Sequence, residues 1–327
     1  MTEMKKGWIC EIGLLIYPDC QLSAIHGLTD LFRIAGEWAD GDDPRKVRVT
    51  HWRAEEGCEP TCIWDTHPGK TYCLDYVSAP PSIVMPNKMQ PMAKEAAWLQ
   101  SKHEEGSRVC SVCAGAFVLA ESGLLKGRRV TTHWAFAKQL AARYEDVEVA
   151  ERNLVLDDGD IMSAGGILAW TDLGLTLVER LFGRSTMLST ARFLVIQPPR
   201  ATQLAFTEFF PEFEHGDEAF LRVQHHIHAH LTASLNLDDL SDVAHLGKRT
   251  FMRRFSKATS LNPTEYIQQA RVAKARGILE LTSRPLDQIA WEVGYKDPSA
   301  FSKIFQRVSG VSVSEYRQQF GAGSTRP

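Results

Sequence analysis

The stretch IAWEVGYKDPSAFSKIFQRVSG, residues 289–310, decides how the C-terminal third of this 327-residue chain folds. Its second half has the apolar spacing of an amphipathic helix, with Phe301 and Phe305 four residues apart on one face. A shorter helical pattern at residues 286–293 precedes it, and Gly294 supplies the tight turn between the two. A short helix, a tight turn and a second helix with a polar outer face together predict a helix-turn-helix unit.

A second copy of this unit stands 50 residues earlier in the chain. The offset aligns Phe251 with Phe301, Phe255 with Phe305, Arg253 with Lys303, Lys257 with Arg307, and Glu265-Tyr266 with Glu315-Tyr316. The short helix of the earlier copy is expected at residues 237–246, and a long helix at residues 263–281 joins the copies. A single helix of this kind is most often only a solvated amphipathic helix, but two copies at one offset indicate a duplicated functional unit.

The polar face of each second helix predicts sequence-specific binding to double-stranded DNA. Such a helix fits the major groove, where its polar side chains read base edges and its Lys and Arg side chains reach phosphates. The joining helix is about 25 Å long at 1.5 Å per residue, which suits two recognition helices in successive turns of the groove about 34 Å apart. The residues expected to contact DNA are Lys248, Arg249, Thr250, Arg253, Arg254 and Lys257 in the first copy, and Ser299, Ser302, Lys303, Gln306 and Arg307 in the second.

The distribution of charge agrees with a polyanionic partner for the tail alone. From Leu235 to Pro327 the chain carries 14 Lys and Arg against 9 Asp and Glu, a balance of +5, and the remainder carries −8. Charge varies along many chains and this excess is modest, so charge by itself does not settle the partner.

Residues 289–310, continued by Tyr316-Arg317, resemble the signature of the AraC/XylS family, and the resemblance covers the last hundred or so residues. It implies a transcription regulator, with activation and repression both open. Two residues depart from the family pattern: His245 stands where the first copy commonly has Gly, and Val313 where the second commonly has Pro. Both departures change turn geometry, and neither removes a residue of a recognition face.

The first half of the chain alternates apolar or β-branched runs with helical patterns. Strands are expected at residues 9–17, 47–52, 109–112, 154–156 and 160–163 and near Val130, and helices at residues 22–38, 92–102, 116–122 and 167–182. This alternation predicts an α/β domain with a mostly parallel sheet flanked by helices, followed by an all-α double helix-turn-helix domain.

The expected organisation is an α/β domain at residues 1–195, a linker at residues 196–220 and a DNA-binding domain at residues 221–327. Gln197-Pro198-Pro199-Arg200 and the stretch from Phe209 to Gly216 carry the turn residues typical of a linker. A fragment of residues 217–327 is therefore expected to fold by itself.

Residues 109–117, VCSVCAGAF, predict a strand, a sharp turn and a helix, with Cys113 at the turn. The small residues Ala114 and Gly115 allow the chain to turn sharply, as in nucleophile elbows. A thiol at a helix N-terminus is expected to have a lowered pKa and to be reactive. Most buried cysteines are inert packing residues, so the motif gains meaning only from its surroundings.

Those surroundings, residues 126–133, 153–160 and 163–166, resemble the ThiJ/PfpI (class I amidotransferase-like) fold across most of residues 8–185. With its tail, the whole chain resembles the GlxA-type regulators of the AraC/XylS family. In relatives that are enzymes, a glutamate of the first helix, the elbow cysteine and a histidine form the active site. The resemblance places Cys113 and His133 at the last two positions, whereas Ala24 stands at the first, with no carboxylate within three residues.

The missing carboxylate implies a ligand sensor without catalytic residues rather than an enzyme. The resemblance implies a small-molecule effector bound at Cys113, Ala114, His133 and Gly165, a homodimer and no cofactor. The alternative is an enzyme of the glyoxalase or amidohydrolase type whose tail only localises it.

Membrane and secreted proteins do not fit this sequence. No apolar run reaches the roughly 18–20 residues that a membrane span needs, and the polar start lacks a signal-peptide cleavage site. The seven cysteines all precede residue 114, which indicates reduced thiols in a cytoplasm.

Three further groups of side chains could bind a metal or a cation, or could simply pack. Zinc at Cys58, Cys62, Cys73 and His67, a metal at His225, His226, His228 and His230, and a cation cage from Trp134 and Trp170 are the candidates. Packing or a solvated helix face is the favoured interpretation of each, so no metal site is expected.

Overall fold

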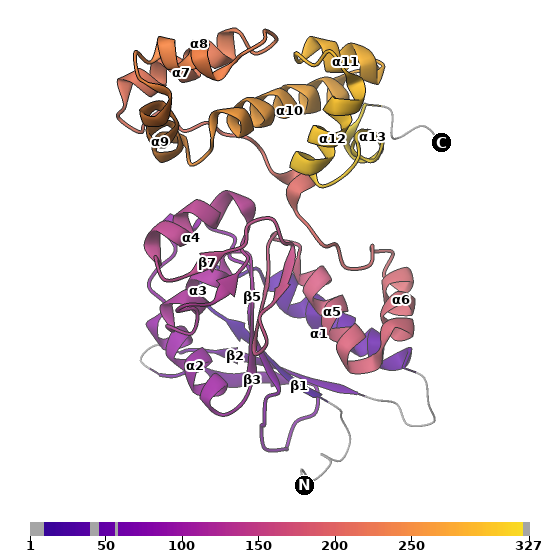
Figure 1. Cartoon of the computed structure of the whole chain (residues 1–327). Helices are drawn as coiled ribbons and strands as arrows, with labels where there is room; N and C mark the ends of the chain where they lie inside the picture. The colour runs from indigo at the N-terminus through magenta and orange to yellow at the C-terminus, as the bar shows by residue number, and fades with distance from the viewer. Residues whose placement is uncertain (1–9, 40–45, 56–57, 323–327) are drawn as a thin grey trace. The chain divides into compact units, whose positions relative to one another are not determined.

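The computed structural model describes residues 10–39, 46–55 and 58–322 of the chain. Its contacts divide the chain into two compact units, with the boundary between Gln203 and Leu204 (Figure 1). Ile9, where the first strand is expected to begin, and the polar start of the chain lie outside the described residues. Within the described part, every helix is too short or too polar to cross a membrane.

The first unit is built on a seven-stranded sheet in the order β3-β2-β1-β4-β5-β9-β8. Its strands are β1 (Cys10–Ile16), β2 (Val47–Arg53), β3 (Thr61–Asp65), β4 (Tyr76–Ala79), β5 (Arg108–Val112), β8 (Val155–Asp157) and β9 (Ile161–Ala164). The five central strands are parallel, and only the edge strands β3 and β8 pair antiparallel. The predicted mostly parallel sheet is confirmed.

Helices cover both faces of this sheet (Figure 1). One face carries α1 (Leu22–Glu37), α5 (Trp170–Phe182) and α6 (Arg184–Phe193), and the other carries α2 (Ala93–Glu104), α3 (Gly115–Glu121) and α4 (Ala137–Arg143). Burial on both faces explains why a central strand such as β1 reads as a nearly continuous apolar run. A short pair of strands, β6 (Arg129–Val130) and β7 (Glu148–Val149), lies outside the main sheet.

Five strands and α-helices of the first unit were not predicted from the pattern: β3, β4, β7, α4 and α6. The edge strand β3 is mostly exposed and has no apolar alternation, and β4 is only four residues long. Helix α5 begins at Trp170 and not at residue 167, because residues 166–169 form a turn closed by the Ala169 amide on the Gly166 carbonyl. Short and irregular segments carry too little periodicity to be recognised.

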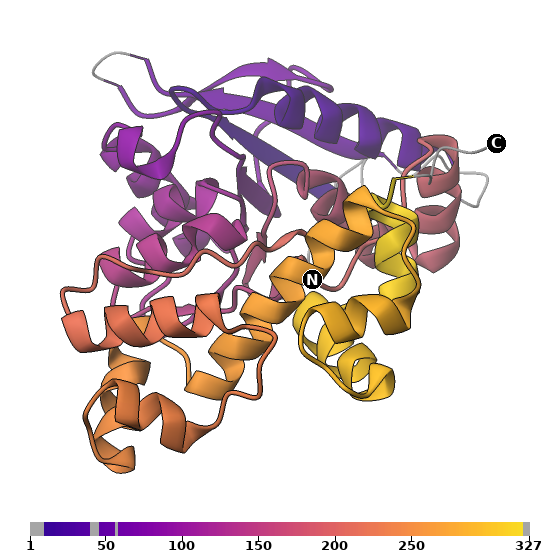
Figure 2. The same ribbon diagram turned by 90° about the horizontal axis from the view of Figure 1, so that it is seen from above.

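The second unit is all-helical. Its helices are α7 (Glu218–Ala229), α8 (Leu237–Val243), α9 (Lys248–Thr259), α10 (Pro263–Leu281), α11 (Leu286–Glu292), α12 (Pro298–Ser309) and α13 (Val313–Phe320). Helix α10 has the bounds predicted for the joining helix, and Figure 2 shows it running between two groups of shorter helices. Its N-terminal half packs into one core cluster with α7–α9, and its C-terminal half into another with α11–α13.

The two halves of this unit repeat in detail. From the second residue onward, α9 and α12 have the same order of buried, half-buried and exposed positions. The helix after each, α10 and α13, begins with a capping box, Asn262 with Glu265 and Ser312 with Glu315. The duplication inferred from the 50-residue offset is therefore also a structural repeat.

The turn between the two helices of each copy takes the left-handed conformation. It falls on His245 (φ +54°) in the first copy and on Gly294 (φ +92°) in the second. A side chain on Gly294 would also meet the Arg271 guanidinium, 2.9 Å from the ideal Cβ position. His245 therefore keeps the turn of the family pattern, but it does so with a residue that is disfavoured at positive φ.

Candidate functional site

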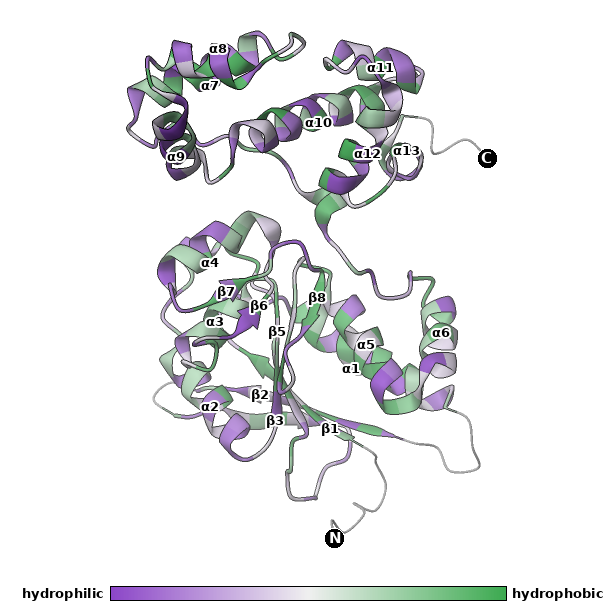
Figure 3. Cartoon of the chain, viewed as in Figure 1, coloured by the Kyte–Doolittle hydropathy of each residue, from purple (hydrophilic) through white to green (hydrophobic). Residues whose placement is uncertain are grey.

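The outer faces of α9 and α12 carry the residues predicted to contact DNA. Nine of these eleven residues are exposed: Lys248, Arg249, Thr250, Arg253, Lys257, Ser299, Lys303, Gln306 and Arg307. Arg254 and Ser302 are half-buried. The inner faces carry the fully buried pairs Phe251 and Phe255, and Phe301 and Phe305, so each helix separates packing from polar surface; α9 is largely purple in Figure 3.

Some of these predicted side chains already have protein partners. Arg254 donates to the Asp217 carboxylate at 2.7 Å, and its guanidinium lies 5.4 Å from the centroid of the Phe220 ring. Ser302 donates to the Pro298 carbonyl within its own helix, at 2.9 Å. Arg254 is thus held against α7, which makes it a structural residue as well as a predicted DNA contact.

Four basic side chains of the outer faces carry no ion pair within the described part of the chain: Arg249, Arg253, Lys257 and Lys303. Lys248 pairs with Asp238, and Arg307 donates to Gln268. Uncompensated cations on one exposed helix face attract phosphate, whatever the sequence of the polyanion.

The turn at Cys113 has the geometry of an elbow. Cys113 has φ +54° at the end of β5, and its amide donates to the Ala164 carbonyl of β9 at 2.8 Å. Gly115 follows at the first turn of α3, where a Cβ would lie 2.4 Å from the Ala79 carbonyl oxygen. The small residue predicted to permit the sharp turn is therefore required by close backbone approach.

The thiol at this elbow is not activated. Cys113 is 2% exposed, and burial raises the pKa of its thiol to about 12, although a hydrogen bond from the Ala114 amide acts in the opposite direction. The lowered pKa predicted from the helix N-terminus is wrong, because desolvation of a thiolate outweighs that contribution. The neighbouring Tyr17 is also buried, and its hydroxyl donates to the Pro80 carbonyl at 2.5 Å; burial is likewise the main reason that its pKa is raised.

His133 lies on the turn that follows β6. Its Nδ1 accepts a hydrogen bond from the Ala135 amide at 3.1 Å, and burial lowers the pKa of its ring. The link from this turn to the elbow is the preceding residue, Thr132, whose hydroxyl donates to the Cys113 carbonyl at 2.7 Å. Ala24, at the place of the family glutamate, is fully buried in α1.

Gly165, predicted to line the same site, is covered by a residue that the sequence did not single out. The carboxamide of Gln203 lies against it, so that a Cβ on Gly165 would stand 2.7 Å from Gln203 Nε2. Gln203 and Thr132 were not predicted as site residues, because their role depends on contacts with residues that lie 19 to 71 positions away in the chain.

The other candidate groups have packing partners. His228 hydrogen-bonds the Tyr266 hydroxyl at 2.9 Å, the His226 and His230 rings lie 4.3 Å apart, and His225 stacks on Phe213. The Trp170 ring would clash with a Cβ on Gly27 of α1, which places it in the core. No three metal-binding side chains gather anywhere in residues 10–39, 46–55 or 58–322.

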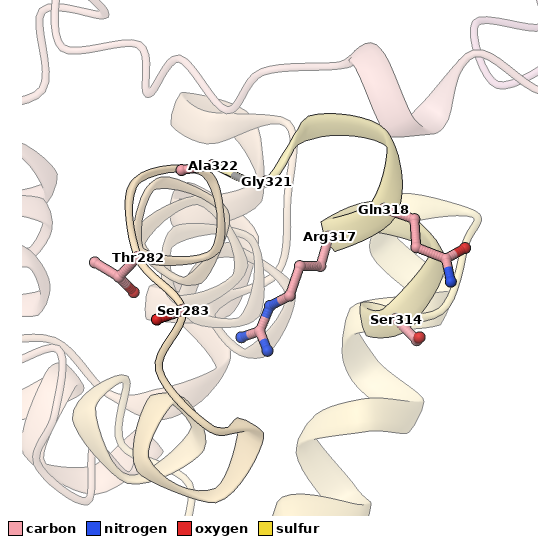
Figure 4. Close-up of a pocket in the computed structure, with 7 residues that line it drawn as sticks. All are labelled: Thr282, Ser283, Ser314, Arg317, Gln318, Gly321 and Ala322. Atoms are coloured by element: carbon pink, nitrogen blue, oxygen red, sulfur yellow. The ribbon is translucent and has the colours of Figure 1, made fainter. Parts of the chain in front are cut away.

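A cavity of about 290 Å³ lies where α10 ends beside α13 (Figure 4). The residues that line it are Thr282, Ser283, Ser314, Arg317, Gln318, Gly321 and Ala322. The Arg317 guanidinium donates to the Arg284 carbonyl. This cavity was not predicted, and it belongs to neither recognition face.

Comparisons with known proteins agree with both units. A profile described as a helix-turn-helix domain matches residues 240–319, and a profile described as the DJ-1/PfpI family matches residues 83–180. Isonitrile hydratase of Pseudomonas putida is 30% identical over 182 residues, which cover 54% of this chain and 74% of that enzyme.

Two relatives are named as transcription regulators. GbdR of Pseudomonas aeruginosa is 25% identical over 226 residues, which are 69% of this chain and 61% of GbdR. GlxA of Rhizobium meliloti is 24% identical over 220 residues, 66% of this chain and 67% of GlxA. The chain thus spans about three-fifths of the length of GbdR. A DJ-1/PfpI domain followed by a helix-turn-helix domain confirms the resemblance of the chain to the GlxA-type regulators of the AraC/XylS family.

Proposed function

We propose that the chain is a sequence-specific DNA-binding transcription regulator. The observation that carries the proposal is the repeated outer face of α9 and α12, where exposed basic residues occupy the same helical positions in both copies. The similarity to GbdR and GlxA supports it. We also propose that the protein acts in the cytoplasm, because a regulator that binds chromosomal DNA works where that DNA lies.

Replacing Arg253 or Lys303 with Ala is expected to weaken binding to a cognate duplex by about 1–3 kcal/mol where the side chain reads a base. The duplex is one that the wild-type protein selects from a random pool, and affinity is measured by fluorescence anisotropy at several salt concentrations. A side chain that touches only phosphate would instead weaken binding to all duplexes equally and make the salt dependence shallower.

Lys274→Ala is the matched control for this experiment, because Lys274 is an exposed lysine of α10 and lies on neither recognition helix. It removes the same charge and is expected to change affinity much less. Affinity that stays at the wild-type value in both Arg253→Ala and Lys303→Ala would contradict the two-helix reader.

The second part of the proposal is that a small-molecule effector binds beside Cys113, Ala114, His133 and Gly165. The support is convergence: the ends of β5 and β9 and the turn of His133 are joined there by the bonds of Cys113 and Thr132. Ligands of open parallel sheets bind at the carboxyl ends of the strands. A thermal-shift screen of amino acids, betaines and other nitrogenous metabolites tests it, since a ligand raises the melting temperature of the state it binds.

Catalysis at Cys113 is the competing function, because isonitrile hydratase of Pseudomonas putida resembles part of the chain. Two observations oppose it. Ala24 supplies no carboxylate to accept a proton, and the buried thiol is neutral at physiological pH. We therefore propose that this unit binds its ligand without turning it over.

Cys113 is expected to react with iodoacetamide at pH 8 at least about a hundredfold more slowly in the folded protein than in urea. The thiolate is the reacting species, and its fraction falls tenfold for each unit by which the pKa exceeds the pH. Labelling is followed by peptide mass spectrometry, with the exposed Cys58 and Cys73 as internal controls. Fast labelling of Cys113, with isonitrile turnover that Cys113→Ser abolishes, would favour the enzyme.

We also propose that two copies of the chain act as a homodimer. The repeat lets one chain read two turns of the groove, and a second chain would read a second half-site with a raised effective concentration. Sedimentation of the full chain with and without its selected duplex tests this assembly.

A further inference from the structure

The last residue of the first unit is held by an unusually complete set of hydrogen bonds. Gln203 is 2% exposed. Its Nε2 donates to the carbonyl oxygens of Thr132 at 2.9 Å, Glu151 at 2.8 Å and Asn153 at 3.2 Å, and its Oε1 accepts from the Trp134 amide at 3.2 Å. A side chain that only filled space would not need four backbone partners from two separate loops.

The cradle around this carboxamide is shaped by a glycine. A Cβ built on Gly165 would lie 2.7 Å from Gln203 Nε2 and 2.8 Å from both Cδ and Oε1. The next residue, Gly166, is different, since a Cβ there would meet only the Ala169 Cβ, at 4.0 Å. Gly165 thus leaves room for Gln203, and Gly166 has no such constraint.

The cradle is directly connected to the elbow. Thr132 accepts from Gln203 through its carbonyl and donates to the Cys113 carbonyl through its hydroxyl. On the other side, Cys113 and Gly165 flank Ala164, whose carbonyl accepts from the Cys113 amide at 2.8 Å. A change of structure at Cys113 can therefore reach Gln203 by two routes, one through Thr132 and one through Ala164 and Gly165.

Leu204, the residue after Gln203, belongs to the second unit and is hydrogen-bonded within it. Arg276 of α10, 9% exposed, donates to the Leu204 carbonyl at 2.9 Å and to the Thr207 carbonyl. Its Nε donates to the Ser309 hydroxyl at 3.1 Å, at the last residue of the recognition helix α12. The buried Arg276 guanidinium therefore connects the first residues of this unit to the end of its second recognition helix, α12.

From these contacts we infer that Gln203 is a positioning residue for the effector response, a carboxamide latch whose release loosens the Leu204–Thr207 segment and, through Arg276, the end of α12. This inference rests on the proposed effector site. It adds the residue through which ligand binding there would affect the second unit. No free residue separates the two anchors, because Gln203 is held in one unit and Leu204 in the other. When Gln203 is held, the backbone just before Leu204 is already ordered. This lowers the entropic cost of forming the Arg276 contacts.

The test is amide hydrogen exchange in the full chain, without DNA and without any added ligand. Gln203→Leu keeps the approximate volume and removes all four hydrogen bonds. We expect about tenfold faster exchange both around Thr132–Trp134 and in the last turn of α12, because losing the restraint makes local opening easier. A role confined to the first unit would leave α12 unchanged, and that result would overturn the inference.

A second variant reaches the same latch without touching Gln203. Gly165→Ala is expected to push the carboxamide out and to reproduce the exchange pattern of Gln203→Leu, whereas Gly166→Ala is the matched control and is expected to leave α12 as in the wild type. In the background of Gln203→Ala, where the space is empty, Gly165→Ala should add little further exchange. Full additivity of the two changes would contradict a shared latch.

The outcome is separable from the fate of the proposed function. Exchange in α12 reports the latch even if the wild-type chain fails to select a duplex from the random pool, a failure that would remove the regulator proposal alone. Conversely, a chain that binds DNA but shows no exchange response in α12 in either variant keeps its proposed function and loses the latch.

Discussion

A fragment that begins at residue 217 should be less stable than one that begins at residue 204 by about 3 kcal/mol or more. The shorter fragment lacks the Leu204 and Thr207 carbonyls, which accept two hydrogen bonds from the buried Arg276. A hydrogen bond to a charged group contributes about 1.5–3 kcal/mol, and a buried cation left without acceptors costs its desolvation. Against a total of about 5–15 kcal/mol, this loss is large.

The shorter fragment also lacks other contacts that residues 204–216 make with the helices of the second unit. The Phe209 ring lies 5.1 Å from the Tyr266 ring, and the buried Gln224 donates to the Glu212 carbonyl at 2.8 Å. The expectation that residues 217–327 fold by themselves therefore omits part of the domain's own structure. Urea unfolding of both fragments, followed by circular dichroism, measures the difference.

Arg276→Met is the control that assigns the cause. In the longer fragment it should destabilise, because it removes three hydrogen bonds. In the shorter fragment it should be neutral or stabilising, because it removes a buried charge that has lost two acceptors. Equal stability of the two wild-type fragments would show that residues 204–216 only rest on the surface of the domain.

Phe305→Ala should destabilise the second unit by about 3–5 kcal/mol, the usual cost of removing a buried phenyl ring. Phe305 is fully buried in the core cluster of α11–α13, against Phe301 and Tyr316. The loss should appear first as faster hydrogen exchange in α11–α13. Helices α7–α9 should respond less, because their cluster contains a different Phe pair.

Phe210→Ala is the matched control for this substitution. The same ring is removed, but Phe210 is 66% exposed, so the expected change is less than about 0.5 kcal/mol. Thermal unfolding of the full chain and exchange by mass spectrometry give the two readouts. Equal losses of exchange protection in α7–α9 and α11–α13 after Phe305→Ala would show that the halves unfold as one.

The helix-turn-helix tail was predictable because its signals are local. Pro263 at the first position of α10, Asn262 as its cap and the Phe pairs at four-residue spacing all act within one or two turns, and the predicted bounds of α10 match the observed ones. The parallel sheet was predictable for a similar reason, since runs such as β1 are buried along nearly their whole length.

The features that sequence reasoning missed depend on distant partners. Nothing near Gln203 in the chain indicates that its amide meets the loops at Thr132 and Asn153, and nothing near Arg276 marks it as buried. The error at Cys113 is of the same kind. A helix N-terminus is visible in the sequence, whereas the depth of burial that raises the thiol pKa is a property of the assembled core.

From their second residue onward, helices α9 and α12 bury the same helical positions and expose the same ones, so packing and DNA recognition can evolve separately in each. The inward positions hold Phe251, Phe255 and Thr259 in one helix and Phe301, Phe305 and Ser309 in the other. The exposed positions, such as Arg253 and Lys257 in α9 and Lys303 and Arg307 in α12, lie outside these cores, so they can be substituted with little effect on the fold. Each helix can therefore drift to a new target site independently of its twin, and the residues of one outer face could be grafted onto the other to redesign specificity.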